Sequence, residues 1–144
     1  MHGHELVAGC GNGWVLDELA RHPWRLRVGT ARKLKRLLKA HRRPSGGSSL
    51  LLRCSPYRLP VRDTMVNTAL LINPFVELKD PHACVYELVR TLAPKGALIC
   101  RCTAQHEERL ATLLSSCGFA YYRQGPWWVG RRMEQSSSPL QQQA

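Results

Sequence analysis

The stretch ELVAGCGNGWVLDELA, residues 5–20, holds three glycines at alternating positions between an apolar run and an amphipathic run. Glycine has no Cβ, so such a loop can adopt positive φ angles and bring a ligand against backbone amides. If residues 6–8 form a strand and residues 14–20 begin a helix, those amides point toward the ligand at the positive end of the helix dipole. A tight turn that needs glycine only for its geometry is the alternative. The stretch therefore predicts a strand–loop–helix unit, with or without a bound metabolite.

Length and composition fit one folded domain. The chain has 144 residues, 44% of them hydrophobic, and a single domain typically takes ~100–200 residues. No run approaches the ~18 apolar residues of a membrane span, and no secretion signal is visible. The six cysteines lack zinc-type spacing, which favours reduced thiols in a cytoplasmic protein without a metal site. We expect a domain over residues 1–132 and a disordered tail over residues 133–144, which are rich in Ser and Gln.

Positive charge is concentrated in one part of the chain. The formal net charge is +11, and positions 19 to 62 carry 13 Lys and Arg residues but no acidic residue. Such a block attracts polyanions over long distances, and RNA is the commonest polyanion in a cell. A solvated helix face with many charges is the alternative.

Apolar strand patterns alternate with helical patterns along the chain. Helices are expected at residues 31–41, 81–92 and 107–116. Strands are expected at residues 6–8, 24–28, 50–52, 66–72 and 97–102, and as a final pair at 119–125 and 127–133. A turn is expected at residues 94–96, before the fifth strand. This order predicts an α/β fold with a mostly parallel sheet covered on both faces.

Four segments, in this order, carry a family resemblance. They are LVAGCGNG (residues 6–13), YRLPVRD (57–63), DPHACVYELVRTLAPKGALI (80–99) and LLSSCGF (113–119). Together they resemble the class I S-adenosylmethionine (SAM)-dependent methyltransferases of the UbiE-like group over residues 5–131. The resemblance implies a Rossmann-like doubly wound sheet with a C-terminal antiparallel hairpin, and SAM as cofactor. The family's N-terminal helix is expected to be missing, since the first strand begins almost at Met1.

The resemblance also implies a set of site residues. Those that it places against SAM are Gly9, Cys10, Gly11, Asn12, Gly13, Ala31, Ser55 and Asn73. Asn73 is also expected near the reaction, because Asn73-Pro74-Phe75 resembles the N-P-P-[YF] box of amino-methylating enzymes without its second proline. Such enzymes gain much of their rate from positioning, so no triad is expected.

The sequence departs from the family at three positions that are usually acidic. They are occupied here by Val7, by Ala31 and by the pair Cys54-Ser55, with Glu5 as the only nearby carboxylate. Ribose hydroxyls left without a partner cost ~1–3 kcal/mol each. Two such losses would weaken cofactor binding by roughly a hundredfold or more.

Two functions therefore stay open. The first is an active methyltransferase with a small-molecule or RNA acceptor, on which Trp24, Tyr57 or Phe75 stacks. The second is a non-catalytic methyltransferase-like domain that binds RNA or an acidic protein through its basic helix. The contact residues would be Arg32, Lys33, Lys35, Arg36, Lys39, Arg42 and Arg43. A dinucleotide-binding domain is a weaker third option, because the loop lacks G-x-G-x-x-G spacing.

Overall fold

The computed structural model describes residues 4–8, 26–32, 34–42 and 50–132. The predicted glycine loop at residues 9–13, the following helix, Trp24, Lys33, Arg43 and the tail at 133–144 lie outside the described residues. The strands of the sheet and four helices fall within them.

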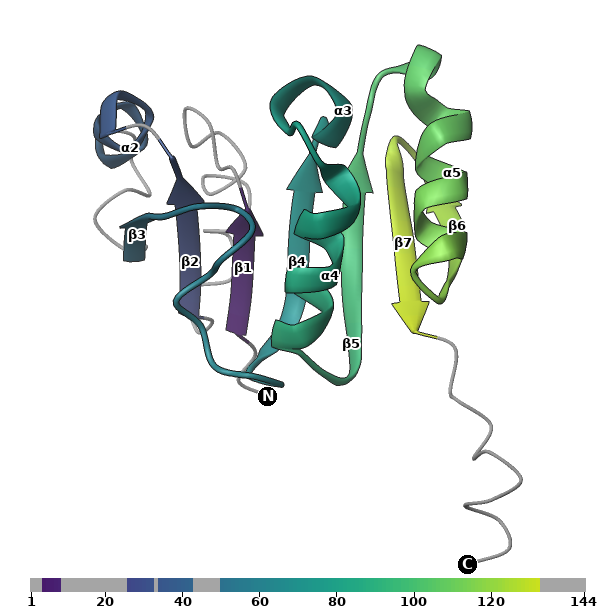
Figure 1. The fold of residues 1–144 in the computed structure, drawn as a ribbon, viewed down its shortest axis with the longest axis horizontal. Helices are drawn as coiled ribbons and strands as arrows, with labels where there is room; N and C mark the ends of the chain where they lie inside the picture. Colours follow the sequence, from purple (N-terminus) through teal and green to yellow (C-terminus); the bar gives the residue numbers. More distant parts are fainter. Residues whose placement is uncertain (1–3, 9–25, 33, 43–49, 133–144) are drawn as a thin grey trace, which may run out of the picture.

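A seven-stranded sheet runs through the described part of the chain, in the order β3-β2-β1-β4-β5-β7-β6 (Figure 1). The strands are β1 (His4–Ala8), β2 (Leu26–Ala31), β3 (Leu50–Arg53), β4 (Val66–Ile72), β5 (Leu92–Arg101), β6 (Phe119–Gln124) and β7 (Trp127–Arg132). The first five pair in parallel, and β7 runs antiparallel to both β5 and β6. The predicted α/β fold, with its mostly parallel sheet and C-terminal hairpin, is confirmed.

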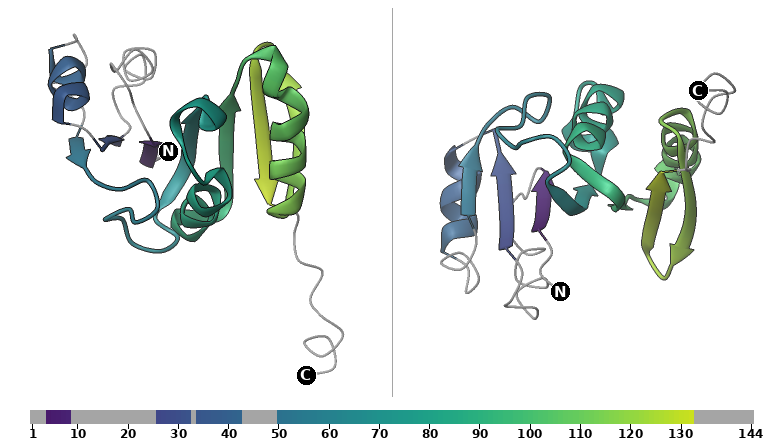
Figure 2. Two further views of the ribbon diagram at one scale, coloured as in Figure 1. Left: turned by 45° about the horizontal axis from the view of Figure 1, so that its top comes forward. Right: turned by 90° about the horizontal axis from the view of Figure 1, so that it is seen from below.

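Helices cover both faces of this sheet, as the views in Figures 1 and 2 show together. They are α2 (Leu34–His41), α3 (Pro74–Glu77), α4 (Pro81–Thr91) and α5 (Glu107–Ser116), with a short 3-10 turn η2 (Ala104–His106) before α5. Helices α4 and α5 pack on one face, and α2 packs on the other, as expected for a doubly wound fold.

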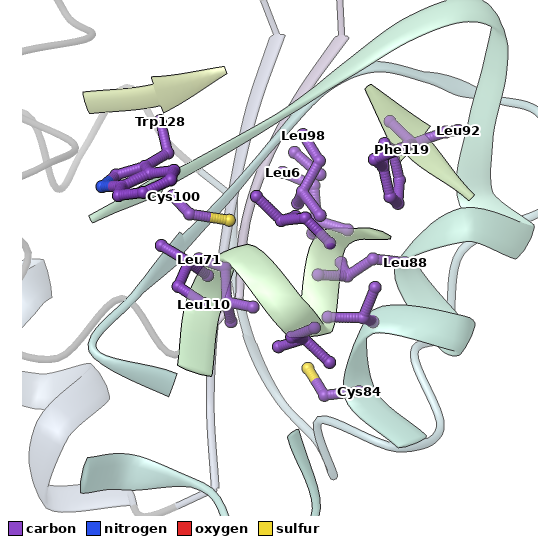
Figure 3. Close-up of a cluster of buried hydrophobic side chains, with 14 of the residues drawn as sticks. Leu6, Leu71, Cys84, Leu88, Leu92, Leu98, Cys100, Leu110, Phe119 and Trp128 are labelled. Atoms are coloured by element: carbon purple, nitrogen blue, oxygen red, sulfur yellow. The ribbon is translucent and has the colours of Figure 1, made fainter. Parts of the chain in front are cut away.

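The larger core lies between the sheet and helices α4 and α5. Alternate residues of the parallel strands, such as Leu6, Leu71 and Leu98, meet Leu88 of α4 and Leu110 of α5 (Figure 3). All five are almost completely buried. A smaller cluster on the opposite face joins the intervening strand residues to α2. Because side chains alternate between the faces of a strand, each central strand contributes to both clusters.

Several element boundaries differ from the sequence prediction, and one helix is new. The strand expected at 24–28 is described from Leu26 and continues to Ala31, so α2 begins at Leu34 instead of residue 31. The turn expected at residues 94–96 lies inside β5, which already starts at Leu92. Helix α3 was not expected, because Pro74 was interpreted only as the end of a strand. Proline is also a favoured first residue of a helix, since its missing N–H has no partner there anyway.

Candidate functional site

The carboxyl ends of the five parallel strands meet at one edge of the sheet, called the carboxyl edge below. Strand order changes direction at β1, which has β2 on one side and β4 on the other. In open α/β sheets, ligands bind in the crevice outside the carboxyl ends of the strands at such a switch point. The carboxyl edge beside β1 is therefore the place to look for a site, and the predicted glycine loop follows β1 directly in the sequence.

Two of the predicted cofactor residues lie close together at this edge. The backbone N–H of Cys54 donates to the carbonyl oxygen of Ala31 over 3.1 Å, which places Ser55 one residue away. The hydroxyl oxygen of Ser55 accepts a hydrogen bond from the N–H of Tyr57 at 3.2 Å. Burial raises the pKa of the Cys54 thiol, and a hydrogen bond with Thr30 opposes that rise, so the thiol stays protonated at neutral pH.

The side chain of Ala31 points into the apolar cluster beneath α2. It is only 4% exposed and packs with Val7 and Leu37. A carboxylate in its place would lose its hydration without gaining a partner from this cluster. Close packing of α2 against the end of β2 thus gives a physical reason for a small apolar residue at this position.

Glu5, the one carboxylate near the first strand in sequence, lies away from the carboxyl edge. It sits in β1 three residues before Ala8, opposite Arg27 of β2 in the sheet register. Both charged side chains are almost fully buried. Opposite charges on neighbouring strands favour each other, so we assign Glu5 to the sheet interior.

Asn73 follows β4 at the carboxyl edge and holds an unusual backbone conformation. Its φ and ψ angles are 48° and 54°, in the left-handed region. Asn is one of the few residues other than glycine that tolerates this region, and such residues cluster at functional sites. Its N–H donates to the carbonyl oxygen of Arg101 at 2.8 Å, which ties the ends of β4 and β5 together. Its half-buried side chain does not cap α3.

A cluster of ring and cationic side chains lies beside Asn73. The ring of Phe75 in α3 has the guanidinium carbon of Arg109 at 4.4 Å from its centroid and the ring of His106 at 5.6 Å. Phe75 was predicted as a stacking residue, whereas His106 and Arg109 were not. Both lie after β5, far from Phe75 in the sequence. No local sequence pattern therefore predicted their contact with Phe75.

Tyr57, in contrast, has a structural role. Its hydroxyl oxygen accepts hydrogen bonds from the backbone N–H groups of Lys79 and Asp80, at 3.1 and 3.0 Å, just before α4 begins. Its ring packs against the larger core. That Tyr57 also stacks on a substrate stays a prediction.

The predicted basic surface is present on α2. Lys35, Arg36 and Lys39 are exposed, as are Arg32 and Arg42 at its two ends. Arg36 forms an ion pair of 3.5 Å with Glu77 of α3, and Figure 1 shows both helices at the same end of the sheet. The basic helix therefore flanks the carboxyl edge.

A family model for the methyltransferase domain matches residues 6–100, which is more than half of the chain. The chain belongs to this methyltransferase family. Its cofactor is accordingly SAM, as the sequence resemblance implied. The family's electrophile is a methyl group on a sulfonium, and it requires an acceptor positioned in line with the breaking bond.

Solved structures with the same fold include methyltransferases and one cyclase. The chain aligns with a SAM-dependent methyltransferase from Aquifex aeolicus at 17% identity and a TM-score of 0.75, over 90% of this chain and 80% of that one. A SAM-dependent methyltransferase from Methanosarcina mazei aligns at 16% identity and a TM-score of 0.76, over 92% of this chain and 93% of that one. The [4+2]-cyclase SpnF aligns at 19% identity and a TM-score of 0.71, over 85% of this chain and 53% of that one, so this chain spans about half the length of SpnF. Identities this low establish the fold alone, and no curated protein sequence matches the chain.

The described residues fit SAM in part. The residues that the resemblance places against SAM here are Ala31 at the end of β2, Ser55 just after β3 and Asn73 just after β4, and none of them is bulky. The described residues that directly follow these strands, Arg32, Cys54 and Asn73, include no Asp or Glu that could accept hydrogen bonds from both ribose hydroxyls. Glu77, further along in α3, pairs with Arg36. The described helices include none long and apolar enough to cross a membrane. Among the same residues, no three His, Cys, Asp or Glu side chains gather in a metal-binding group.

Proposed function

We propose that this chain transfers a methyl group from SAM to an acceptor bound at the carboxyl edge, through a cofactor site with reduced affinity for the ribose. The observation that carries the proposal is the switch in strand order at β1, directly before a glycine-rich segment of a methyltransferase family member. Fold alone would not suffice, since a cyclase shares it.

The chain's own residues would act mainly by positioning. The half-buried amide of Asn73 offers a donor and an acceptor to a polar acceptor group at the edge. The hydrogen bond between the Asn73 N–H and the Arg101 carbonyl holds the loops after β4 and β5 in place. Orientation of this kind can supply a large part of the rate without a proton-transferring residue.

The lack of a carboxylate directly after the described ends of β2, β3 and β4 sets the expected affinity. Each ribose hydroxyl without a charged partner costs about 1–3 kcal/mol. Two of them lower affinity by about a hundredfold or more, at about 1.4 kcal/mol for each factor of ten. The proposal therefore includes weak cofactor binding, which millimolar ligand would saturate.

A non-catalytic domain that binds RNA or an acidic protein is the second candidate. It is favoured by one observation in particular, the packing of Ala31 beneath α2, because the position of the ribose-binding acid serves the core instead. The exposed cations of α2 would then be the functional surface.

Isothermal titration with SAM and with its demethylated product separates the two candidates. Saturable heat with either ligand at micromolar to millimolar concentration supports the enzyme, and Asn73→Ala should weaken that binding by a few-fold while Arg132→Ala, on the far hairpin, leaves it unchanged. An absence of binding up to the solubility limit of both ligands would overturn the methyltransferase proposal in favour of the second candidate.

A further inference from the structure

The side chains of Phe75, His106 and Arg109, called the ring platform below, form a mixed aromatic and cationic surface at the carboxyl edge. The guanidinium carbon of Arg109 lies 4.4 Å from the Phe75 ring centroid, so the cation covers one side of this ring. The rings of Phe75 and His106 are tilted by 41° at 5.6 Å. Phe75 and His106 are half-buried, whereas Arg109 is exposed. The platform thus presents a flat cation to solvent on an aromatic support.

The platform is held by the loops that follow β4 and β5. Asn73, two residues before Phe75, is bound through its N–H to the end of β5. The hydroxyl of Thr103 and the Nδ1 atom of His106 are hydrogen-bonded at 3.1 Å, which fixes one nitrogen of the imidazole. The other nitrogen, Nε2, has no bonding partner within the described residues. It is therefore available to the edge of a ligand that lies on the platform.

A contact between Arg109 and Phe75 can also be purely structural, since an exposed cation–π pair contributes to stability by itself. The position of Arg109 at the carboxyl edge favours more than that. Two exposed arginines have carboxylate partners, Arg123 in Glu107 at 2.9 Å and Arg36 in Glu77. No carboxylate pairs with Arg109 in the part of the chain that the structure describes.

Positive charge reaches the platform from a second direction. The ion pair between Arg36 and Glu77 joins α2 to α3, the four-residue helix that carries Phe75. Lys35 and Lys39 on α2 are exposed and carry no ion pair among the described residues. A chain of phosphates along α2 would therefore lead to the platform over a short distance.

A nucleobase matches this combination of groups. Single-stranded RNA is recognised by stacking its unpaired bases on aromatic rings or guanidinium planes, while basic side chains hold its phosphates. We infer that the ring platform binds an unpaired nucleobase of a single-stranded RNA, stacked on the Arg109 guanidinium that Phe75 supports and hydrogen-bonded at its edge by His106 Nε2. This inference makes single-stranded RNA the methyl acceptor of the proposed methyltransferase. RNA binding itself does not depend on the proposed function, whereas methyl transfer to the bound base does.

Fluorescence anisotropy with a labelled single-stranded RNA 12-mer of mixed sequence tests the platform. Phe75→Leu keeps apolar volume but removes the aromatic ring, and we expect affinity to fall by about tenfold. Arg109→Gln should act similarly. The matched controls are Val76→Ala, an exposed neighbour on α3, and Arg132→Gln, which removes the same charge at the far end of β7. Both controls should bind the 12-mer as the unaltered chain does.

A blunt RNA duplex of the same length separates stacking from charge. We expect Lys35→Glu with Lys39→Glu to weaken binding to both RNAs and to reduce the dependence on salt, because fewer counterions are released. The platform variants should weaken only single-stranded binding. If Phe75→Leu and Arg109→Gln bind the 12-mer as tightly as their controls, or lose duplex and single strand equally, the inference is overturned. Tighter binding of poly-glutamate than of the 12-mer would also overturn it, in favour of an acidic protein.

Titration of the same variants with SAM keeps this test distinct from that of the proposed function. A chain that binds SAM but shows no platform-dependent RNA binding contradicts only the inference. A chain that binds single-stranded RNA through the platform but not SAM supports the RNA site and contradicts the methyltransferase.

Discussion

At the scale of single residues, Arg90 explains the most specific stretch of the sequence resemblance. Its guanidinium donates to the carbonyl oxygens of Leu59 and Val61 at 3.0 and 2.8 Å. It also forms ion pairs with Asp63 and Glu87, each at 2.7 Å. The carboxylate of Glu87 in turn accepts from the N–H of Leu59 at 2.6 Å. Glu87 and Arg90 of α4 therefore hold residues 59–63 of the loop between β3 and β4. This part of the loop does not belong to the carboxyl edge.

This network predicts a pH-dependent stability. The hydrogen bond from Arg90 lowers the pKa of Glu87 below its ordinary value of 4.5. Below pH 4.5 the Glu87 carboxylate therefore binds a proton more readily in the unfolded chain than in the folded one. Its contribution to the free energy of unfolding is present above pH 4.5 and is lost as the pH falls through the pKa of the folded state. We expect Glu87→Gln to lower the free energy of unfolding by about 1–2 kcal/mol at neutral pH, and to flatten its decline in acid.

Urea denaturation across acidic and neutral pH measures both effects. Glu108→Gln is the control, since Glu108 is an exposed acid for which the structure shows no side-chain partner. It should leave the pH profile unchanged. An equally steep acid decline in Glu87→Gln would show that the network adds little to stability.

At the scale of elements, the pairing of β4 with β5 contains a jump in register. Val66 pairs with Leu92, whereas Thr68 pairs with Ala97, so β5 accommodates several extra residues opposite one residue of β4. Lys95 turns the chain there with a φ of 66°. A Cβ added at Gly96 would lie 2.8 Å from the carbonyl oxygen of Ala93. The proline–glycine turn expected from the sequence exists, but as a bulge within a continuous strand.

The bulge predicts opposite behaviour for neighbouring substitutions. Gly96→Ala should destabilise the fold by about 1–3 kcal/mol, because the new methyl group meets backbone atoms that cannot move independently. Lys95→Gly should change stability by less than about 1 kcal/mol, since relief of the left-handed conformation offsets the added freedom of the unfolded chain. Thermal unfolding of the two variants checks this. A neutral Gly96→Ala would mean that the strands shift to accept it.

At the scale of the whole molecule, the net charge of +11 opposes compaction. Raising NaCl from about 20 to about 300 mM shortens the range of charge repulsion to below ~10 Å. We expect the thermal midpoint to rise by a few degrees with salt, and to rise less in the variant Lys35→Gln with Lys39→Gln. Differential scanning calorimetry measures the midpoint. A midpoint that falls with salt would show that ion pairs such as Arg36–Glu77 outweigh the repulsion.

Local patterns were sufficient for the class of fold and for most elements. Helix α5 and strand β4 lie where periodicity and turn residues predicted them, because a local hydrophobic period is enough to choose between helix and strand. The order of elements then left few topologies, and the predicted parallel sheet with its hairpin is confirmed. The predicted cofactor contacts in residues 9–13 stay a prediction.

Sequence alone determined the alternation of strands and helices, the family and its cofactor, because these depend on local periodicity and short motifs. Tertiary structure alone decided what several candidate side chains contact. It packs Ala31 beneath α2, ties Tyr57 to the start of α4 and brings Phe75 against His106 and Arg109. These outcomes depend on contacts between segments far apart in the chain, and a local pattern contains no information about which distant side chain will lie against it.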